Sequence, residues 1–307
     1  MAQVRVAFWN VQNLFEPGVV PRGPQSLPEI AEKQRILAEV IDSFFEDAGP
    51  DLLGLAEIGT EAILGELLGR LRDDYVHVWE RPGTAEQTGL GLAARRSLMV
   101  DMEVVSVQRP SVAARPRCMV VRCLTRLHPE PFLVVVNHWK SRMGSVLDQQ
   151  RDRLETADWL GEYLANQSRE TCVIVIGDFN AEPFEAPFGE LRLRGKRTFS
   201  NALWASGTPA YLYNTAWRFM SEPDAWEDAR QANYVESRPK TTHGQSGVNI
   251  FDHLLVSGRA LRGGPLELRE RSVNLHLHPR TLRQSAAGVL RPRPWTFPAG
   301  GDHDGSS

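Results

Sequence analysis

One stretch of the chain constrains its fold more than any other: the unbroken apolar run Cys172–Ile176, with the sequence CVIVI. A strand that is apolar at every position is typical of burial on both faces of a sheet. Other runs, such as Val4–Trp9, alternate between core-facing and solvent-facing positions, which indicates strands with one buried face. Stacked sheets with helices outside them produce this mixture, so we expect an α/β fold.

The remaining predicted strands are short apolar runs spread along the chain. They cover Leu52–Ala56, Tyr75–Trp79, Leu90–Ala94, Leu98–Val107, Cys118–Leu124, Phe132–Asn137 and Phe251–Val256. Two amphipathic segments, Glu29–Ala48 and Leu147–Ala165, are predicted to be helices because their apolar residues recur at helical spacing. Ser26 and Glu29 match a capping box at the start of the first helix. Without an internal repeat or a convincing linker, residues 1–307 are interpreted as one domain.

Composition excludes several classes of protein. The net charge is -3, which argues against a highly charged nucleic-acid coat but leaves a local basic groove open. No window is long and apolar enough to span a membrane, and the first residues do not match a signal peptide. Cys118, Cys123 and Cys172 cannot all pair and lack zinc-type spacing, so we expect buried thiols in a cytoplasmic protein. Five residues apart in one strand, Cys118 and Cys123 should point to opposite faces.

Polar residues stand at the ends of the apolar runs. They are Asn10, Glu57, His138, Asp178, Asn180 and Asp252, and the pair Asp302-His303 follows near the end of the sequence. Each has an ordinary structural explanation: Asn10 could start a turn, and Glu57 could cap a helix. Residues at the ends of several strands nevertheless converge on one rim, where a rigid scaffold can hold them against a ligand.

The chemistry of this set favours metal-assisted cleavage of a phosphoester. Mg²⁺ and Mn²⁺ are hard cations that keep several waters, and they suit the oxygen donors Asn10, Glu57, Asp178 and Asn180. The nearby His138 offers a proton donor, or a donor to the negative charge that develops on the phosphate. Asp178 and Asn180 are two residues apart, so in an extended segment they project to the same side.

In this order the residues resemble the endonuclease/exonuclease/phosphatase superfamily, which includes deoxyribonuclease I-like nucleases. The segments WNVQNLF, NHWKSR and IGDFNAEP are similar to bacterial members in particular. The resemblance implies a four-layer sandwich of two packed mixed β-sheets flanked by helices. It also implies metal ligands, which are Asn10, Glu57 and Asp302. The catalytic residues that it implies are His138, Asp178, Asn180, Asp252 and His303.

The resemblance further implies a role for each catalytic residue. Asp178 would orient or deprotonate the attacking water, and Asn180 would contact the phosphate. His138 would donate to the phosphate or to the leaving oxygen. Asp252 would orient His303, and attack would be in line at phosphorus with the metal neutralising charge.

Two departures from the family pattern leave alternatives open. Gln12 stands where some relatives have an acid, so a second metal position stays open. Relatives continue into an apolar strand after the terminal Asp-His pair, whereas four residues follow Asp302-His303 here. Either this pair is the true terminal motif, or it is a lookalike in a chain truncated before that motif and its strand.

The substrate is predicted from smaller differences. Inositol polyphosphate phosphatases usually carry Tyr-Arg where this chain has Ala181-Glu182, which favours DNA or RNA as the substrate of a nuclease. The stretch Arg259–Arg293 holds eight arginines and is either a phosphate-facing flap or a solvated loop. The alternatives are a soluble phosphatase or phosphodiesterase acting on a small phosphoester, and a catalytically weak nucleic-acid-binding scaffold.

Overall fold

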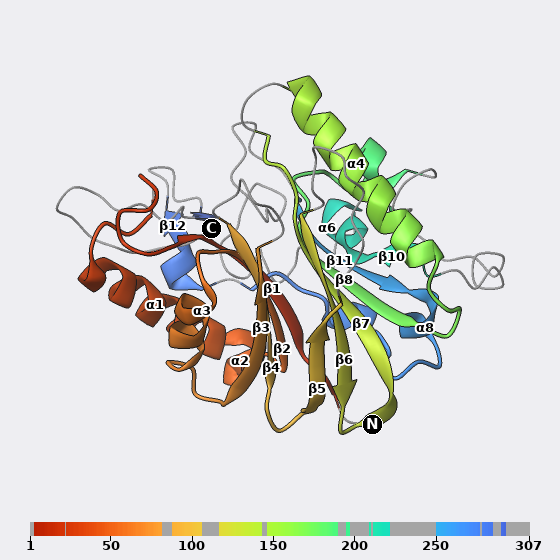
Figure 1. Ribbon diagram of the computed structural model, residues 1–307, viewed down its shortest axis with the longest axis horizontal. Coiled ribbons are helices and arrows are strands. Elements are labelled where there is room, and N and C mark those ends of the chain that lie inside the picture. The colour runs from red at the N-terminus through yellow and green to blue at the C-terminus, as the bar shows by residue number, and fades with distance from the viewer. Residues whose placement is uncertain are drawn as a thin grey trace.

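The computed structural model describes residues 3–21, 23–81, 88–105, 117–142, 146–189, 195–196, 209, 211–221, 250–276, 278–284 and 290–292. Two mixed β-sheets pack face to face, and helices cover the outer side of each (Figure 1). The predicted four-layer α/β architecture is therefore confirmed. In the described part of the chain, no helix is long and apolar enough to cross a membrane.

One sheet has four strands in the order β1-β2-β4-β3. These strands are β1 (Val6–Leu14), β2 (Leu52–Ile58), β3 (Tyr75–Glu80) and β4 (Gly89–Arg95). β1 and β2 are parallel, and the other pairs are antiparallel. Helices α1 (Leu27–Asp42) and α3 (Glu61–Leu68) cover its outer face, where their leucine and isoleucine side chains pack in one cluster with Leu53 and Leu55.

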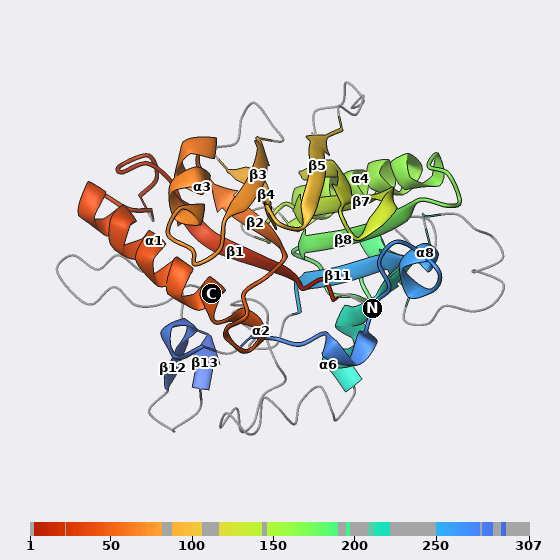
Figure 2. The same ribbon diagram turned by 90° about the horizontal axis from the view of Figure 1, so that it is seen from below.

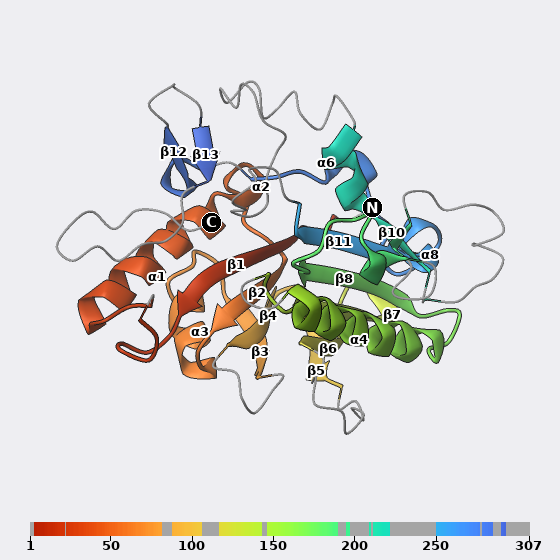
Figure 3. The same ribbon diagram turned by 90° about the horizontal axis from the view of Figure 1, so that it is seen from above.

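The other sheet has seven strands in the order β5-β6-β7-β8-β11-β10-β9. Their bounds are Met99–Val104 (β5), Cys118–Thr125 (β6), His128–His138 (β7), Cys172–Asp178 (β8), Gly195–Lys196 (β9), Leu212–Asn214 (β10) and Asp252–Ser257 (β11). Only β7–β8 and β9–β10 are parallel pairs. Helix α4 (Val146–Ala165) lies along the outer face (Figure 3).

A continuous apolar core fills the space between the sheets. Val136 and Ile176 of the larger sheet share this core with Leu52 and Leu92 of the smaller one. At Gly54 the sheets approach closely, because an added Cβ would lie 2.7 Å from Ile176 Cδ1. Tight packing of this kind fixes how the strand ends of one sheet stand against those of the other.

The prediction of three buried thiols is confirmed. Cys118, Cys123 and Cys172 are free and buried. Cys118 packs in the cluster beneath α4, whereas Cys123 packs in the core between the sheets. The two side chains therefore point to opposite faces of β6, as the odd spacing requires.

The first predicted helix is too long. α1 ends at Asp42, and α2 (Phe44–Asp47) is a separate short turn in which Phe45 and Glu46 have φ of 55° and 58°. Ser43 ends α1 because its hydroxyl donates to the Val40 carbonyl at 2.6 Å, which competes with helix continuation. At the other end, the Ser26 hydroxyl accepts from the Glu29 amide at 3.4 Å, as predicted.

The second predicted helix is confirmed as α4 (Val146–Ala165), but the apolar residue at the start of its predicted range does not pack. Ala157, Leu160 and Leu164 are buried, whereas Leu147 is 79% exposed. Arg153 is buried on the inner side instead and donates to the Lys140 carbonyl at 3.0 Å. A polar contact thus replaces apolar packing near the start of this helix.

Several short elements complete the described chain and escaped prediction. They are α6 (Arg218–Ser221), α8 (Gly258–Leu261), β12 (Leu282–Gln284), β13 (Leu290–Pro292) and the 3-10 turns Ala186–Phe188, Thr215–Trp217, Glu270–Ser272 and Pro279–Thr281. β12 and β13 form a hairpin beside α1 (Figure 2). Arg280 pairs there with Glu39 of α1 at 3.3 Å.

Candidate active site

A row of polar side chains crosses one end of the seven-stranded sheet. β7, β8 and β11 are neighbours, and their register places His138 beside Asp178 and Asp178 beside Asp252. Two residues earlier along β7 and β8, Val136 and Ile176 face the core between the sheets. Because side chains alternate along a strand, the polar row continues this inner face, toward the smaller sheet.

The smaller sheet adds Asn10 from β1 and Glu57 from β2 to the same place. Asn10 Nδ2 donates to Glu57 Oε1 at 3.0 Å and to Asp178 Oδ2 at 3.2 Å. His138 Nε2 lies 3.4 Å from Glu57 Oε1. Four of the predicted site residues, drawn from four strands and both sheets, are therefore in contact.

The strands bend where they carry these residues. The pairing of β2 with β4 shifts register between Ala56 and Ile58, and Glu57 between them has a left-handed φ of 64°. A β-bulge re-aims a side chain in this way, and a left-handed glutamate costs about 1–3 kcal/mol that the surrounding fold must offset. Backbone strain at this point is typical of a functional position.

β1 bends beside Glu57 as well. Gln12 and Asn13 have φ of 48° and 52°. The Asn13 amide donates to Glu57 Oε2 at 2.8 Å, and the Gln12 amide donates to Asn10 Oδ1 at 3.0 Å. Both Glu57 oxygens thus accept hydrogen bonds, while the Asn10 amide group presents its NH₂ side to the carboxylates. Metal ligation by the Asn10 oxygen stays a prediction.

Asp178 ends β8, and the chain turns immediately after it. Asn180 has a φ of 47°, so the expectation that Asp178 and Asn180 project together from an extended segment is wrong. The Asn180 amide instead donates back to Asp178 Oδ1 at 2.9 Å, and Asn180 Nδ2 donates to the Trp139 carbonyl at 3.0 Å. The turn thereby ties the end of β8 to the end of β7.

Burial controls the electrostatics of Asp178, which is 3% exposed. Loss of solvation raises the pKa of its carboxyl above the ordinary value, and the negative charge of Glu57 adds to this rise. His138 and the hydrogen bonds from Asn180 and Asn10 oppose it. A buried carboxylate with a raised pKa is a stronger proton acceptor than an exposed aspartate.

Two cations border the site that the sequence reasoning did not single out. Arg117 precedes β6, and its carbonyl accepts from the His138 amide at 3.0 Å, so it extends the polar row by one strand. Burial lowers the pKa of Arg117 to about 10, against attraction by Asp152 and Glu57. A positive charge beside His138 suits a phosphate-binding face.

The second cation is Lys33 of α1, which is fully buried. Its ammonium group donates to the Gln12 carbonyl. Burial lowers the pKa of Lys33 to about 7, and attraction by Glu57 opposes this change. In the sequence, Lys33 falls three residues after Ile30 and four before Leu37, on the apolar face of the helix, but this position alone does not show that its ammonium group is buried.

The proposed partner of Asp252 cannot be placed, because Asp302 and His303 lie outside the described residues. The neighbouring His253 has a different environment. Its Nε2 lies 2.8 Å from the Ile250 carbonyl and its Nδ1 lies 3.0 Å from Asn214 Nδ2. Burial lowers the pKa of His253 to about 4, so this histidine is a neutral part of the packing.

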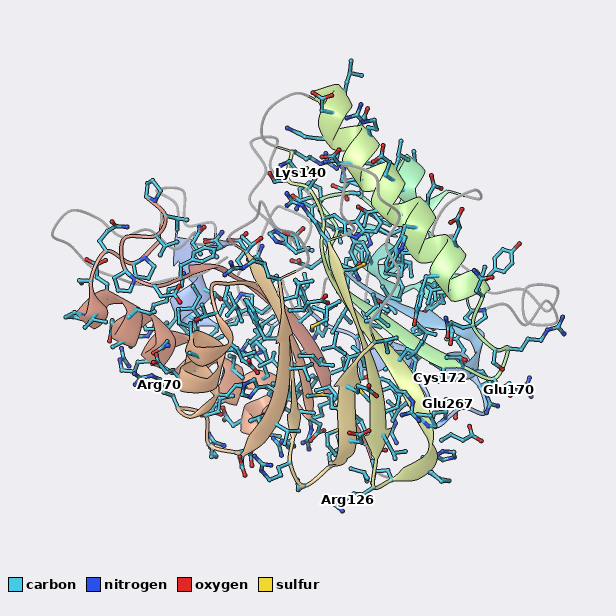
Figure 4. The ribbon with its side chains drawn as sticks, in the orientation of Figure 1. Arg70, Arg126, Lys140, Glu170, Cys172 and Glu267 are labelled. Carbon is cyan, nitrogen blue, oxygen red and sulfur yellow. The ribbon has the colours of Figure 1, made fainter. Side chains whose placement is uncertain are left out.

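One residue of the arginine-rich stretch, Arg259, lies away from the site. Arg259 lies beyond the end of β11 opposite Asp252 and pairs with Glu130 at 3.1 Å and Glu170 at 3.3 Å. Figure 4 shows Glu170 at the opposite end of the sheet from Lys140, which follows the site strand β7. The flap interpretation is wrong for Arg259, and the side chains of Arg283, Arg291 and Arg293 lie outside the described residues.

The donor set fits a hard divalent cation. In the described ranges, no group of three or more His, Cys, Asp or Glu side chains is arranged to hold a metal unaided. Mg²⁺ needs only one or two carboxylates and keeps its remaining waters. Glu57 supplies one carboxylate at the bulge, and a cation there would relieve its repulsion with Asp178.

The packed mixed sheets and the polar rim define a phosphoesterase of the deoxyribonuclease I-like class. The chain belongs to the Endonuclease/Exonuclease/phosphatase family, which it matches over residues 7–303. No curated protein sequence matches it.

Solved structures agree on the fold at low sequence identity. The catalytic domain of human Nocturnin with a bound sulfate anion is 19% identical, with 83% of this chain and 82% of that chain covered and a TM-score of 0.50. A D. rerio TDP2 humanised by 14 mutations is 14% identical, with coverages of 94% and 93% and a TM-score of 0.50. D. rerio TDP2 complexed with a single-strand DNA product is 15% identical, with coverages of 83% and 83% and a TM-score of 0.50.

Proposed function

We propose that this phosphoesterase is a Mg²⁺- or Mn²⁺-dependent nuclease that hydrolyses DNA or RNA by in-line attack of water. The observation that carries the proposal is the contact of Glu57 and Asp178 through Asn10, with His138 alongside. Carboxylates from two sheets meet there with a histidine and without a thiol. A phosphodiester cleavage needs such oxygen donors, a proton acceptor and a donor to the phosphate.

Glu57 would be the principal metal ligand, with Asn10 beside it and Asp302 completing the set. The bound cation supplies neutralisation of the charge on the non-bridging phosphate oxygens. The family match includes residues 302 and 303, which supports Asp302-His303 as the terminal motif.

Asp178 would hold the attacking water and accept its proton. Two observations support this role: the raised pKa of the carboxyl, and the hydrogen bonds from Asn10 and Asn180 that fix its two oxygens. His138, 8% exposed, would donate from Nε2 to a phosphate oxygen or to the leaving oxygen.

The remaining roles concern the substrate. Asn180 would contact the phosphate, and Asp252 would orient His303 in its charged form. Arg117 supports a polyanionic substrate because it places a further cation along the same row. The structure of D. rerio TDP2 with a single-strand DNA product shows that this fold accommodates such a strand in that protein.

A substrate panel tests the proposal. Single-stranded DNA, RNA, plasmid, abasic duplex, inositol phosphates and p-nitrophenyl phosphate would be incubated with Mg²⁺ or Mn²⁺, with Asp178→Asn as the inactive control. We expect turnover of a nucleic acid that a chelator abolishes. Turnover confined to the small phosphoesters would replace the nuclease proposal with a phosphatase. Nucleic-acid binding without any turnover would support a scaffold.

A further inference from the structure

Lys33 is buried in a place where a lysine is costly. It lies in the second turn of α1 with 0% of its surface exposed, although α1 packs mainly through Leu37, Ile41 and other apolar residues. A buried ammonium group loses its hydration and is retained only where polar partners offset this loss. Its partner is the Gln12 carbonyl at the bend of β1, beside the site.

The Gln12–Asn13 peptide group links Lys33 to Glu57. Its carbonyl oxygen accepts from the Lys33 ammonium, and its N–H, on Asn13, donates to Glu57 Oε2 at 2.8 Å. The plane of this peptide is therefore held from both sides, by a cation and by a carboxylate. Such an arrangement polarises the peptide and strengthens both hydrogen bonds.

The orientation of the Gln12–Asn13 peptide plane requires contacts that hold it in place. Gln12 and Asn13 on either side of it both have left-handed φ, at 48° and 52°. Such φ values are rare for a side chain like that of Gln12, whereas asparagine tolerates them. Rotation of this peptide would change the ψ of Gln12 and the φ of Asn13, so the present arrangement persists only if the peptide is held in place. That rotation would withdraw the Asn13 N–H from Glu57 and leave the carboxylate free to turn. The Gln12 amide, which fixes Asn10 Oδ1, lies in the same bend.

We propose that Lys33 is a positioning residue of the active site, which fixes the Gln12–Asn13 peptide and through it the orientation of the Glu57 carboxylate toward the metal. This inference rests on the proposed metal role of Glu57. The role of Lys33 in fixing the Gln12–Asn13 peptide does not depend on that metal role. Lys33 touches neither substrate nor metal in this scheme. Supporting contacts of this type change metal affinity by roughly 10–100-fold when they are removed.

The test uses Lys33→Met, which keeps the apolar stem and removes the donor and the charge. Arg35→Met is the matched control, since Arg35 lies on the same helix with a half-exposed side chain paired to Glu32 and Glu39. Amide hydrogen exchange of Asn13 would be measured in the metal-free proteins, and Mn²⁺ affinity by titration calorimetry. We expect exchange at least about tenfold faster and Mn²⁺ binding about tenfold weaker in Lys33→Met, with saturating metal restoring most of kcat.

Each outcome decides the inference. Unchanged Asn13 exchange in Lys33→Met overturns it, as does Mn²⁺ binding that stays equal or becomes tighter, because the lysine would then act only as a competing cation. Glu57→Gln in the same titration separates the two ideas: if it weakens binding and Lys33→Met does not, only the role of Lys33 fails. Wild-type protein that binds no Mn²⁺ refutes the proposed function and the metal part of this inference together.

Lys33→Gln keeps the inference testable if Lys33→Met does not fold. The glutamine retains an N–H donor near the Gln12 carbonyl without a charge. We expect the Asn13 exchange rate and the Mn²⁺ affinity of Lys33→Gln to differ from the wild-type values by less than the tenfold changes expected for Lys33→Met. Values in Lys33→Gln that match those of Glu57→Gln would overturn the hydrogen-bonding role.

Discussion

His138 Nε2 lies 3.4 Å from Glu57 Oε1, although the two residues belong to different sheets. His138 ends β7 of the seven-stranded sheet, and Glu57 stands in the bulge of β2 in the four-stranded sheet. Asn10 makes a second bridge from the smaller sheet to Asp178. The site thus exists only where the two sheets pack together, which ties its chemistry to the core between them.

Glu57→Gln should weaken metal binding without disturbing the fold. The change keeps the shape of the side chain and the hydrogen bond from the Asn13 amide, but it removes the charge that attracts the cation. We expect turnover at limiting Mg²⁺ to fall sharply and to recover in part at high Mg²⁺. Equal turnover of both proteins at limiting metal would remove Glu57 from the metal site.

Asp178→Asn should abolish most activity and leave stability near that of the wild type. A neutral amide of the same size avoids the cost of burying a charge, which raises the pKa of the carboxyl. Its NH₂ group cannot accept one of the two hydrogen bonds from Asn10 and Asn180, and this loss offsets the gain. Loss of a general base lowers kcat by about a hundredfold or more. Melting temperature and kcat would be measured together, with the exposed Asp74→Asn as control. An active but unstable Asp178→Asn would give Asp178 a structural role instead.

His138→Ala should likewise lower kcat by about a hundredfold, in the range of a lost acid or charge-stabilising donor. The imidazole lies at the polar end of β7 beside Glu57, so we expect the melting temperature to stay near that of the wild type. A substrate with a better leaving group separates the two roles. If activity on it recovers, His138 protonates the leaving oxygen; if it stays low, the donor acts on the phosphate.

Gly54→Val should separate the sheets and so disturb the site at a distance. Even a Cβ would lie 2.7 Å from Ile176 Cδ1, and valine adds two further methyl groups. Overpacking of this type costs about 1–3 kcal/mol. We expect kcat to fall while the protein stays folded at 25 °C, with a smaller effect in Gly54→Ala. Full activity in a destabilised Gly54→Val would show that the contacts across the sheets tolerate such movement.

His253 should make the protein less stable in acid. Its folded-state pKa is lowered from 6.5 to about 4 by burial, so between these values the unfolded chain binds a proton that the folded chain does not. The stability contributed by neutral His253 is therefore lost as pH falls from about 6.5 toward 4, by up to roughly 1.4 kcal/mol per pH unit. Urea unfolding across this range should show a shallower pH dependence in His253→Gln. Identical slopes would contradict the assignment.

The sequence predicted the sheets and the clustering of four polar residues because both follow from local patterns. A continuously apolar strand such as Cys172–Ile176 must lie between layers, and residues at the ends of such strands must meet at one edge. The contacts that hold the cluster were not predictable in this way. The contact of Asn10 with both Glu57 and Asp178 depends on how one sheet packs on the other. The left-handed turns at Glu57 and Asn180 could not be predicted from the spacing of apolar residues.

Lys33 shows why a pattern also misleads. At helical spacing among apolar residues, a lysine is expected to extend its ammonium group to solvent. Here the ammonium group points inward, because it donates to the Gln12 carbonyl and is attracted by the Glu57 carboxylate. Similarly, Arg259 belongs to a run of arginines, but it forms ion pairs with Glu130 and Glu170 far from the site.

The left-handed backbone at Gln12, Asn13, Glu57 and Asn180 predicts the order in which activity and structure are lost in denaturant. Asparagine tolerates this conformation, but Gln12 and Glu57 are held in it by the packing around them. Strained segments of this kind relax before the strands that restrain them. In rising urea, inactivation should therefore precede unfolding, with activity lost while the circular dichroism of both sheets is still intact. Saturating metal, which would bind only the intact site, should bring the two transitions together.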